Sequence, residues 1–419
     1  MSCIVFANKP ILSIQGTVEV PVSKSVANRF LVLDFLCGYE RFKKEDSSWS
    51  KDIKAMWKAL ASIKKGEHHI DIGESGTALR FLGSVLSIQE GQTFTLTGNG
   101  RIPERTMQPL VEALHSIGAE INYLEKEGFA PLLIQGKKLH PIPLKIDGKA
   151  SSQFASALLL IAPFLEGGLT LQLSKDSKSL SYLALTLETL GLYGAKYRVN
   201  DEAIIIPQQT LIPPSLKWPS DWSSVPYFLA LAACVKDASI LVKEVQKDLT
   251  QADCIAIELF KTHFGVDCTF DESGLYIRHQ TDQVSTSKIC LDGTNYPDLV
   301  PTIICCAAVL RREVEFSGIE HLRFKESDRI ATLEAALKKL DYNLQELSPN
   351  VWQGNYEGAS EWPLEITLDT QSDHRMAMSL SLFALAGIKV KMDAADCIDK
   401  SFPKYWQMLS ILGISYEIT

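Results

Sequence analysis

One local pattern recurs along the whole chain and limits the folds that it can adopt. It consists of an amphipathic helical segment, a turn that usually contains glycine, and a short run of β-branched or aromatic residues. Glycine after a helix is a common C-cap, and the run beyond it can begin a strand. Successive copies lie about 70 residues apart, which predicts an α/β (α+β) protein of six supersecondary units in two lobes of three. The copies are residues 56–72, 110–123, 187–199, 257–270, 333–347 and 405–418, and the fifth lacks the glycine.

The composition limits where the chain acts and what it binds. A net charge of −8 argues against broad binding to nucleic acid or to a membrane surface, because both need a basic field. The nine cysteines are scattered without a CxxC pair, as expected of reduced thiols in the cytoplasm. The first residues show no signal-peptide pattern, and the apolar run 303–310 is too short to cross a bilayer. We therefore expect a cytoplasmic protein.

The most informative motif is the charged cluster Lys325-Glu326-Ser327-Asp328-Arg329. It stands where a helix begins, because apolar residues recur at helical spacing from position 330 onward. The N-terminus of a helix carries partial positive charge and unpaired N–H groups, so two added cations suggest an anionic ligand. Taken alone, the cluster is more simply explained as a Ser/Asp helix cap with solvated charges.

Groups suited to oxyanions stand at several other predicted helix starts. Serine hydroxyls, basic side chains and helix N–H groups all favour phosphate or carboxylate ligands. Two or three such caps could arise by chance, but this number favours a shared anion-binding site without metal or cofactor. No cysteine or histidine spacing matches a zinc site. The groups are Lys24, Ser25 and Arg29, Gly76 within residues 73–80, Arg101 and Arg105, Ser151, Ser152 and Gln153, Asp298, Arg375 after Asp373 and His374, and Lys400.

These motifs, in this order and over essentially the whole chain, resemble the EPSP synthase family of enolpyruvyl transferases, the 3-phosphoshikimate 1-carboxyvinyltransferases. The matching segments are 21–29, 73–80, 151–153, 324–329, 373–378 and 400–403. Some positions depart from the family pattern: Val22 replaces a usual Gly, Glu74-Ser75 replaces Asn-Ala, Thr106 and Ser181 replace Pro, and His321 replaces Asn. None of these changes removes a charged catalytic group, so they bear on affinity and detailed contacts.

The resemblance implies a fold and a reaction. The fold would have two lobes, each of three βαβαββ units around parallel helices, with the active site in the cleft between them. Residues 1–20 and 219–419 would form the first, discontinuous lobe and residues 21–218 the second, and prolines near 213–219 mark a seam. The reaction would transfer the enolpyruvyl group of phosphoenolpyruvate to the 5-hydroxyl of shikimate 3-phosphate and release phosphate. The family resemblance further implies a monomer and a target of glyphosate.

Residue roles follow from the resemblance. Asp298 would take the proton of the substrate hydroxyl, and Glu326 would handle the carbon-bound proton with Lys24 or Lys400. Phosphoenolpyruvate would be held by Lys24, Gly76, Arg105, Gln153, Arg329, Arg375 and Lys400. Shikimate 3-phosphate would be held by Lys24, Ser25, Arg29, Ser151, Ser152, Gln153, Ser179, Asp298, His321 and Lys325, with Tyr182 stacked beneath its ring.

Two other functions stay open at this point. A UDP-N-acetylglucosamine enolpyruvyl transferase would share the fold and phosphoenolpyruvate. That family carries a reactive cysteine in the loop that corresponds to residues 98–107, where this chain has none. A non-catalytic anion-binding protein could use the same scaffold, but pure binding would not need the acid/base groups Asp298 and Glu326.

Overall fold

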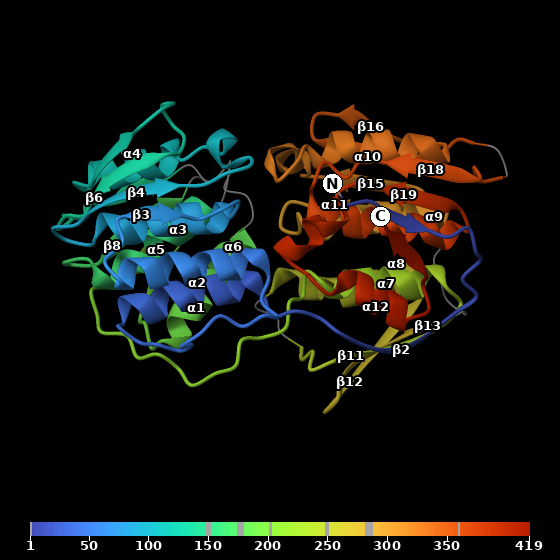
Figure 1. Ribbon diagram of the computed structural model, residues 1–419, viewed down its shortest axis with the longest axis horizontal. Helices are drawn as coiled ribbons and strands as arrows, with labels where there is room; N and C mark the ends of the chain where they lie inside the picture. Colours follow the sequence, from blue (N-terminus) through green and yellow to red (C-terminus); the bar gives the residue numbers. More distant parts are fainter. Residues whose placement is uncertain are drawn as a thin grey trace. The chain divides into compact units, whose positions relative to one another are not determined.

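The computed structural model describes residues 2–146, 152–173, 180–200, 203–247, 251–280, 288–358 and 361–419. The chain divides into two compact units. The first unit combines Met1–Ser23 with Pro219–Thr419, and the second unit is the continuous segment Lys24–Trp218. Each unit combines helices with small mixed sheets, which confirms the predicted α/β class (Figure 1). No described helix combines the length and the apolar character that a membrane span requires.

All six predicted helix–turn–strand segments form. The pairs are α2 (Lys51–Lys64) with β3 (His69–Asp71), α4 (Gln108–Ser116) with β5 (Glu120–Tyr123), α6 (Leu180–Leu192) with β9 (Arg198–Val199), α8 (Ala256–Phe264) with β12 (Val266–Asp271), α10 (Arg329–Leu337) with β16 (Tyr342–Ser348), and α12 (Tyr405–Ile411) with β20 (Tyr416–Ile418). Five of the turns contain a glycine with positive φ. In the fifth copy, which lacks glycine, Asp341 adopts φ +50° instead. Aspartate tolerates this left-handed conformation better than most residues, so the turn is kept.

The described residues of the second unit form two four-stranded sheets, in the orders β3-β4-β6-β5 and β7-β8-β10-β9. The first two helix–strand copies therefore contribute to one sheet. Helices α1 (Lys24–Leu36), α3 (Gly76–Ser87) and α5 (Ser152–Ile161) are apolar around most of their surface, so they pack together in the interior. The remaining strands are β4 (Thr93–Thr97), β6 (Leu132–Gln135), β7 (Leu144–Ile146), β8 (Leu169–Leu173) and β10 (Ala203–Ile206).

The described residues of the first unit form three four-stranded sheets, in the orders β18-β19-β1-β20, β12-β13-β11-β2 and β14-β15-β17-β16. Apolar helices α7 (Val225–Cys234), α9 (Val300–Val309) and α11 (His374–Leu380) are buried, with α9 in contact with both others. The remaining strands are β1 (Ile4–Phe6), β2 (Ser13–Glu19), β11 (Asp237–Lys243), β13 (Gly274–His279), β14 (Ile289–Asp292), β15 (Val314–Ser317), β17 (Val351–Tyr356), β18 (Glu365–Leu368) and β19 (Lys389–Met392).

The N-terminal segment is built into the first unit by strand pairing. β1 lies between β19 and β20 and is antiparallel to both, with Ile4 opposite Met392 and Ile418. β2 pairs in parallel with β11 along its whole length. β1 and β20, which lie near opposite ends of the sequence, therefore belong to the same sheet.

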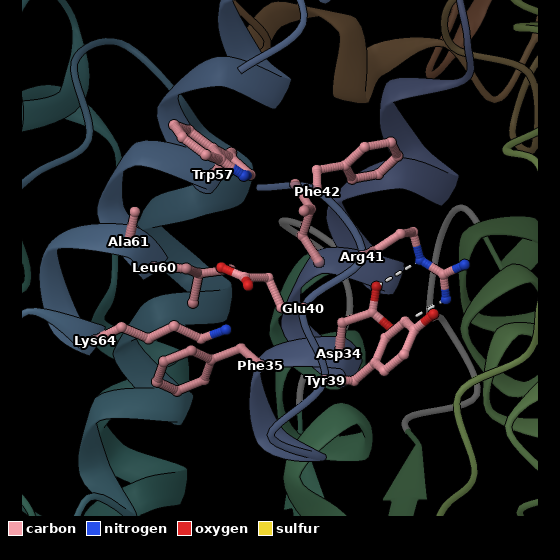
Figure 2. A pocket seen from close by; sticks show the side chains of 11 residues that line it. Asp34, Phe35, Tyr39, Glu40, Arg41, Phe42, Trp57, Leu60, Ala61 and Lys64 are labelled. Atoms are coloured by element: carbon pink, nitrogen blue, oxygen red, sulfur yellow. Dashed lines mark hydrogen bonds and ion pairs between the residues drawn. The ribbon is translucent and has the colours of Figure 1, made fainter. Parts of the chain in front are cut away.

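A buried ion pair connects α1 of the second unit to the segment that leaves this unit. Arg41 donates from Nε to Asp34 Oδ2 at 2.6 Å and from Nη2 to Asp34 Oδ1 at 3.0 Å. Its Nη1 donates to the carbonyl of Pro214 at 2.9 Å, and Tyr193 donates its hydroxyl to Asp34 at 2.6 Å. Figure 2 shows this pair at a pocket whose lining includes Tyr39. The pair holds residue 214 against α1.

We predict that Arg41→Ala destabilises the protein by about 3 kcal/mol, because the change leaves the buried carboxylate of Asp34 without its cation. Urea unfolding measures the change. Arg101→Ala is the matched control, since Arg101 forms an exposed pair with Glu104, and it should cost less than about 1 kcal/mol. Equal effects of the two substitutions would contradict the anchoring role of Arg41.

Candidate functional site

The second unit places several predicted ligand-binding groups at the starts of its buried helices. Lys24 and Ser25 are the first two residues of α1, Gly76 is the first of α3, and Ser152 and Gln153 open α5. Gln153 donates from Nε2 to the hydroxyl of Thr77 at 3.1 Å, which connects the starts of α5 and α3. Ser151 and Ser179, which the resemblance also assigned to the site, lie outside the described residues.

Arg29 is a buried cation whose described hydrogen-bond partners are all uncharged. It donates from Nε to Thr186 Oγ1 at 2.8 Å, from Nη1 to the carbonyl of Ser25 at 2.7 Å and from Nη2 to the carbonyl of Tyr182 at 2.9 Å. Burial lowers the pKa of Arg29 to about 10, against a smaller raising effect of Tyr182. The guanidinium therefore stays charged at neutral pH, and an anionic ligand would compensate the cost of burying it.

Gly76 lies directly against the guanidinium group of Arg105. A Cβ atom at position 76 would overlap Arg105 Nη1 and would also crowd Arg80 Nη1. Arg80 is itself fixed, because it donates to the carbonyls of Gly76 and Thr106, each at 3.1 Å. The structure thus brings together Gly76 and Arg105, which the sequence assigned to one ligand from separate motifs.

Thr106, which replaces a usual proline, has a clear local function. Its hydroxyl accepts a hydrogen bond at 3.2 Å from the backbone N–H of Gln108, the first residue of α4. Threonine in this place satisfies an N–H group that would otherwise lack a partner at the helix start. The replacement of proline by Thr106 therefore leaves Arg105 next to Gly76 in this structure.

In the first unit, Arg329 is the centre of a carboxylate cluster. This arginine is 1% exposed and donates from Nε to Asp373 at 2.8 Å, from Nη1 to Asp298 at 2.8 Å and from Nη2 to Glu326 at 3.0 Å. Longer contacts of 3.4 Å to the carbonyl of Pro297 and to Asp373 Oδ1 occupy its two other N–H groups. Although burial opposes the charge, the three carboxylates raise the pKa of Arg329 above its ordinary value.

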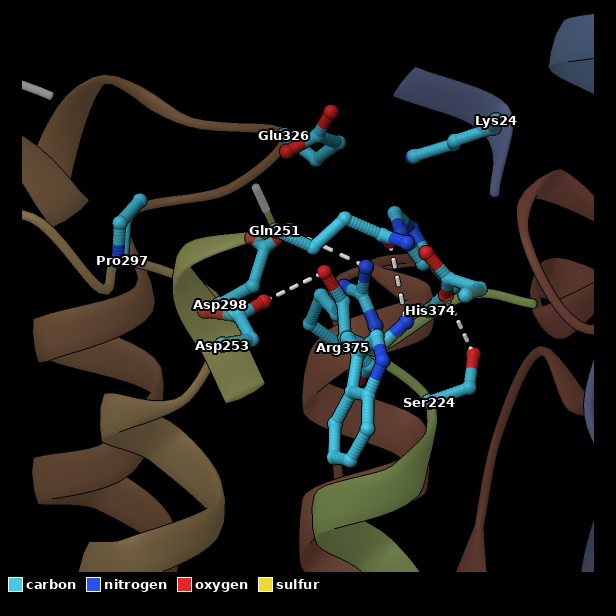
Figure 3. A network of polar contacts seen from close by, with 12 residues as sticks. Lys24, Ser224, Gln251, Asp253, Pro297, Asp298, Glu326, His374 and Arg375 are labelled. Atoms are coloured by element: carbon cyan, nitrogen blue, oxygen red, sulfur yellow. Dashed lines mark hydrogen bonds and ion pairs between the residues drawn. The ribbon is translucent and has the colours of Figure 1, made fainter. Parts of the chain in front are cut away.

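Arg375 binds the other oxygen of Asp298. Its Nη2 lies 3.1 Å from Asp298 Oδ2, while Nη1 donates to the carbonyl of Ser223 at 2.9 Å and to the hydroxyl of Tyr227 at 3.3 Å. Figure 3 shows Asp298, Asp253 and Arg375 close together. Asp298 was a predicted catalytic base, and the structure joins it to both predicted arginines of the first unit.

Asp373 organises this cluster, although no separate role was predicted for it. It is fully buried, caps α11 by accepting from the N–H of Arg375 at 2.9 Å, and accepts from the hydroxyl of Ser327 at 3.1 Å. Ser327 was expected to help start its own helix. That expectation was wrong, because Asp328 alone caps α10, accepting from Ala331 N at 3.0 Å.

Asp253 was missed entirely by sequence reasoning. Its carboxyl group is buried, accepts from the hydroxyl of Ser223 at 2.5 Å and lies near Asp298, Asp221 and Arg375. Burial first, and then the charge of Asp298, raise the pKa of Asp253 to about 7. No spacing or motif marks residue 253, because the feature that matters is its tertiary neighbours.

The remaining predicted residues of the first unit lie on, or directly after, short 3-10 helices that contact α10 and α11. His321 is buried in η4 (Glu320–Phe324), which contacts α10, and Lys325 follows it directly. Lys400 ends η7 (Ala395–Lys400), which contacts α11. Their roles toward a substrate stay predictions.

The two groups of residues differ in charge. In the second unit, Lys24, Arg29, Arg80 and Arg105 are cations, and Lys24 pairs with Asp52. In the first unit, three carboxylates pair with Arg329 and Arg375. The second unit is therefore suited to hold oxyanions, and the first carries paired acid/base groups. Within the described residues, no three His, Cys, Asp or Glu side chains are grouped as a metal site.

The fold is shared with solved enolpyruvyl transferases. EPSP synthase from Acinetobacter baumannii matches with a TM-score of 0.74 and 21% identity over 100% of both chains. The enolpyruvyl transferase NikO from Streptomyces tendae matches with a TM-score of 0.70 and 15% identity, over 100% of this chain and 99% of that chain. These likenesses define an enolpyruvyl transferase fold, as the sequence predicted.

Sequence comparison is more specific. The family described as EPSP synthase (3-phosphoshikimate 1-carboxyvinyltransferase) matches residues 61–409. The 3-phosphoshikimate 1-carboxyvinyltransferase of Bacteroides fragilis is 33% identical over 408 residues, which is 97% of each chain. That of Aliivibrio fischeri is 31% identical over 438 residues, covering 97% of this chain and 98% of the relative. The chain belongs to the EPSP synthase family, which confirms the resemblance.

We predict that Gly76→Ala raises KM for phosphoenolpyruvate by about tenfold, because the new methyl group displaces the Arg105 side chain. Steady-state kinetics with each substrate varied in turn measure the effect. Gly91→Ala is a control for glycine loss, since Gly91 has open space around it, and it should change stability more than KM. An unchanged KM in Gly76→Ala would place Arg105 outside the binding site.

We also predict that Asp253 makes stability depend on pH. Its folded pKa of about 7 lies above the ordinary 3.8, so the folded chain keeps a proton that the unfolded chain releases between these values. The free energy of unfolding therefore falls as pH rises from about 4 to about 7. Because Asn does not titrate, the free energy of unfolding of Asp253→Asn should rise relative to that of wild type by roughly 2–3 kcal/mol as the pH goes from 5 to 8.

Chemical denaturation at both pH values measures this gain. Asp237→Asn, at an exposed position of the same unit, serves as the control and should show no such change. A constant difference between Asp253→Asn and wild type at both pH values would show that Asp253 is already ionised at pH 5.

Proposed function

We propose that this chain transfers the enolpyruvyl group of phosphoenolpyruvate to the 5-hydroxyl of shikimate 3-phosphate, giving 5-enolpyruvylshikimate 3-phosphate and phosphate. The observation that carries the proposal is the pairing of Asp298 and Glu326 on one buried arginine, Arg329. Both proposed acid/base groups contact the same guanidinium, which supports their joint use in one reaction. Family membership over nearly the whole chain supports the same substrates.

The chemistry requires one proton to be added and another to be removed. Asp298 takes the proton of the 5-hydroxyl while the hydroxyl oxygen attacks the second carbon of phosphoenolpyruvate. At the same time, the methylene carbon of phosphoenolpyruvate receives a proton. The resulting methyl group then loses a proton while the phosphate leaves, which restores the double bond. We assign both proton transfers at carbon to Glu326, with Lys24 or Lys400 close to the phosphate.

The cations of both units would hold the charges of the two substrates. Each substrate carries one phosphate and one carboxylate, and basic side chains with helix N-termini bind such groups well. We assign the binding of phosphoenolpyruvate to Arg105, Arg329, Arg375 and Lys400, and that of shikimate 3-phosphate to Ser25, Arg29 and Lys325. Lys24 and Gln153 would contact both.

Phosphate release from shikimate 3-phosphate and phosphoenolpyruvate tests the proposal directly. UDP-N-acetylglucosamine is the alternative acceptor, and the absence of a cysteine in residues 98–107 argues against it. Turnover with that acceptor alone would establish the other transferase activity. Binding of both substrates by folded protein without any phosphate release would favour a non-catalytic anion-binding protein.

The cellular setting is a further part of the proposal. We propose a cytoplasmic monomer that needs no metal or cofactor. None of the nine cysteines forms a disulfide, as expected in a reducing compartment. Light scattering during size-exclusion chromatography tests the oligomeric state, and a mass near 93 kDa instead of 46.5 kDa would show a dimer.

We predict that Glu326→Ala lowers kcat by about 100-fold or more while KM for both substrates changes less than about fivefold. The reason is that Glu326 supplies a proton-transfer group, whereas lysine and arginine side chains supply most of the substrate binding. Glu320→Ala, at an exposed position in the same segment, is the control and should keep near wild-type kinetics. An unchanged kcat in Glu326→Ala would remove this residue from the proton-transfer scheme.

A further inference from the structure

A second carboxylate, Asp52, contacts the predicted site and has no role in the scheme above. Its Oδ2 lies 3.3 Å from the ammonium nitrogen of Lys24, and the two side chains are only 7% and 15% exposed. Asp52 comes from α2, and Lys24 is the first residue of α1. No local pattern predicts this pair, because 28 residues separate its members.

The position of Asp52 favours a fixed, ionised carboxylate. It is the second residue of α2, where the helix macrodipole stabilises negative charge. It is buried, and α2 packs against α1, so its backbone cannot easily move away from Lys24. Burying a carboxylate without a cation would be costly, and the contact with Lys24 removes that cost.

A lysine side chain needs such a partner if its position matters for catalysis. Its four-carbon chain has many rotamers, and fixing it costs about 2 kcal/mol of conformational free energy. The ion pair with Asp52 removes much of this freedom before any substrate arrives. At the same time, the negative charge of Asp52 weakens the attraction of Lys24 for an anion. Asp52 therefore improves the orientation of Lys24 and lowers the affinity of Lys24 for an anionic substrate.

We propose that Asp52 is a positioning residue for Lys24, which it holds in the orientation that the reaction needs at the expense of substrate affinity. This inference rests on the proposed function only for its kinetic consequences. The contact itself predicts a lower accessibility of the Lys24 amine, whatever reaction the protein catalyses.

The kinetic test uses Asp52→Asn, which keeps the size of the side chain and removes its charge. We expect kcat to fall by about tenfold, while KM for phosphoenolpyruvate stays equal or decreases by up to about threefold. A purely structural role would not produce this split between kcat and KM. Glu45→Gln is the matched control, because Glu45 pairs with Lys58 and Lys54 at more exposed positions next to α2.

A double-mutant cycle then asks whether Asp52 acts through Lys24. In a Lys24→Ala background, Asp52→Asn should cause no further loss of kcat/KM. A tenfold further loss in that background, or a single variant with wild-type kcat, would overturn the proposal. Equal thermal unfolding temperatures of wild type and Asp52→Asn would exclude misfolding as the cause of lower kcat.

A second measurement does not depend on turnover. Formaldehyde and a borohydride reductant methylate accessible lysine amines, and peptide mass spectrometry reports the rate at Lys24 in ligand-free protein. We expect Asp52→Asn to increase this rate several-fold relative to Lys389, whose partner Glu365 is unchanged. An unchanged rate would overturn the inference. Failure of phosphate release in wild type, with faster labelling in the variant, would instead reject the proposed function and leave the contact established.

Discussion

The site of the first unit depends on one buried cation. Arg329 holds Asp298, Glu326 and Asp373, and it could not remain buried without them. These carboxylates come from three distant parts of the sequence, so the arginine fixes the start of α10 relative to α11 and to the residues before α9. Since Asp373 also caps α11, the same contact sets the backbone from which Arg375 extends. Removing one member would leave several charges uncompensated.

A substrate cannot bind Arg329 without displacing a partner that this arginine already has. All five of its N–H groups already have partners among the described residues. An anion that binds this guanidinium must therefore replace a carboxylate or carbonyl. Asp373 is the carboxylate least able to move, because its side chain is fully buried, whereas those of Glu326 and Asp298 are 18% and 16% exposed. Such an exchange would release Glu326 or Asp298 when an anion binds.

The sequence predicted features that local chemistry determines. Glycine after a helix predicted five of the six turns, and Asp341 shows that the pattern holds where another residue can adopt a positive φ. Helix-start motifs predicted Arg329, Arg375 and Gly76 as site residues, and the structure brings each into contact with other predicted residues.

Asp52, Asp253 and the organising role of Asp373 could not be predicted in this way. Their importance comes from partners far away in sequence, and a single aspartate has no spacing that distinguishes it from a helix cap. The raised pKa of Asp253 is a clear example, since burial and the nearby charge of Asp298 produce it together. Only the folded structure shows such neighbours.

The strand pairing of the N-terminal segment has a consequence for synthesis on the ribosome. Among the described strands, β1 pairs with β19 and β20, so β1 is synthesised long before its partners. The second unit is complete at residue 218, and at 5–20 residues per second the synthesis of residues 219–419 takes roughly 10–40 s. During that time β1 waits without partners, whereas β11, the partner of β2, is synthesised soon after residue 218. β1 has only three residues, which limits its ability to pair with other nascent chains.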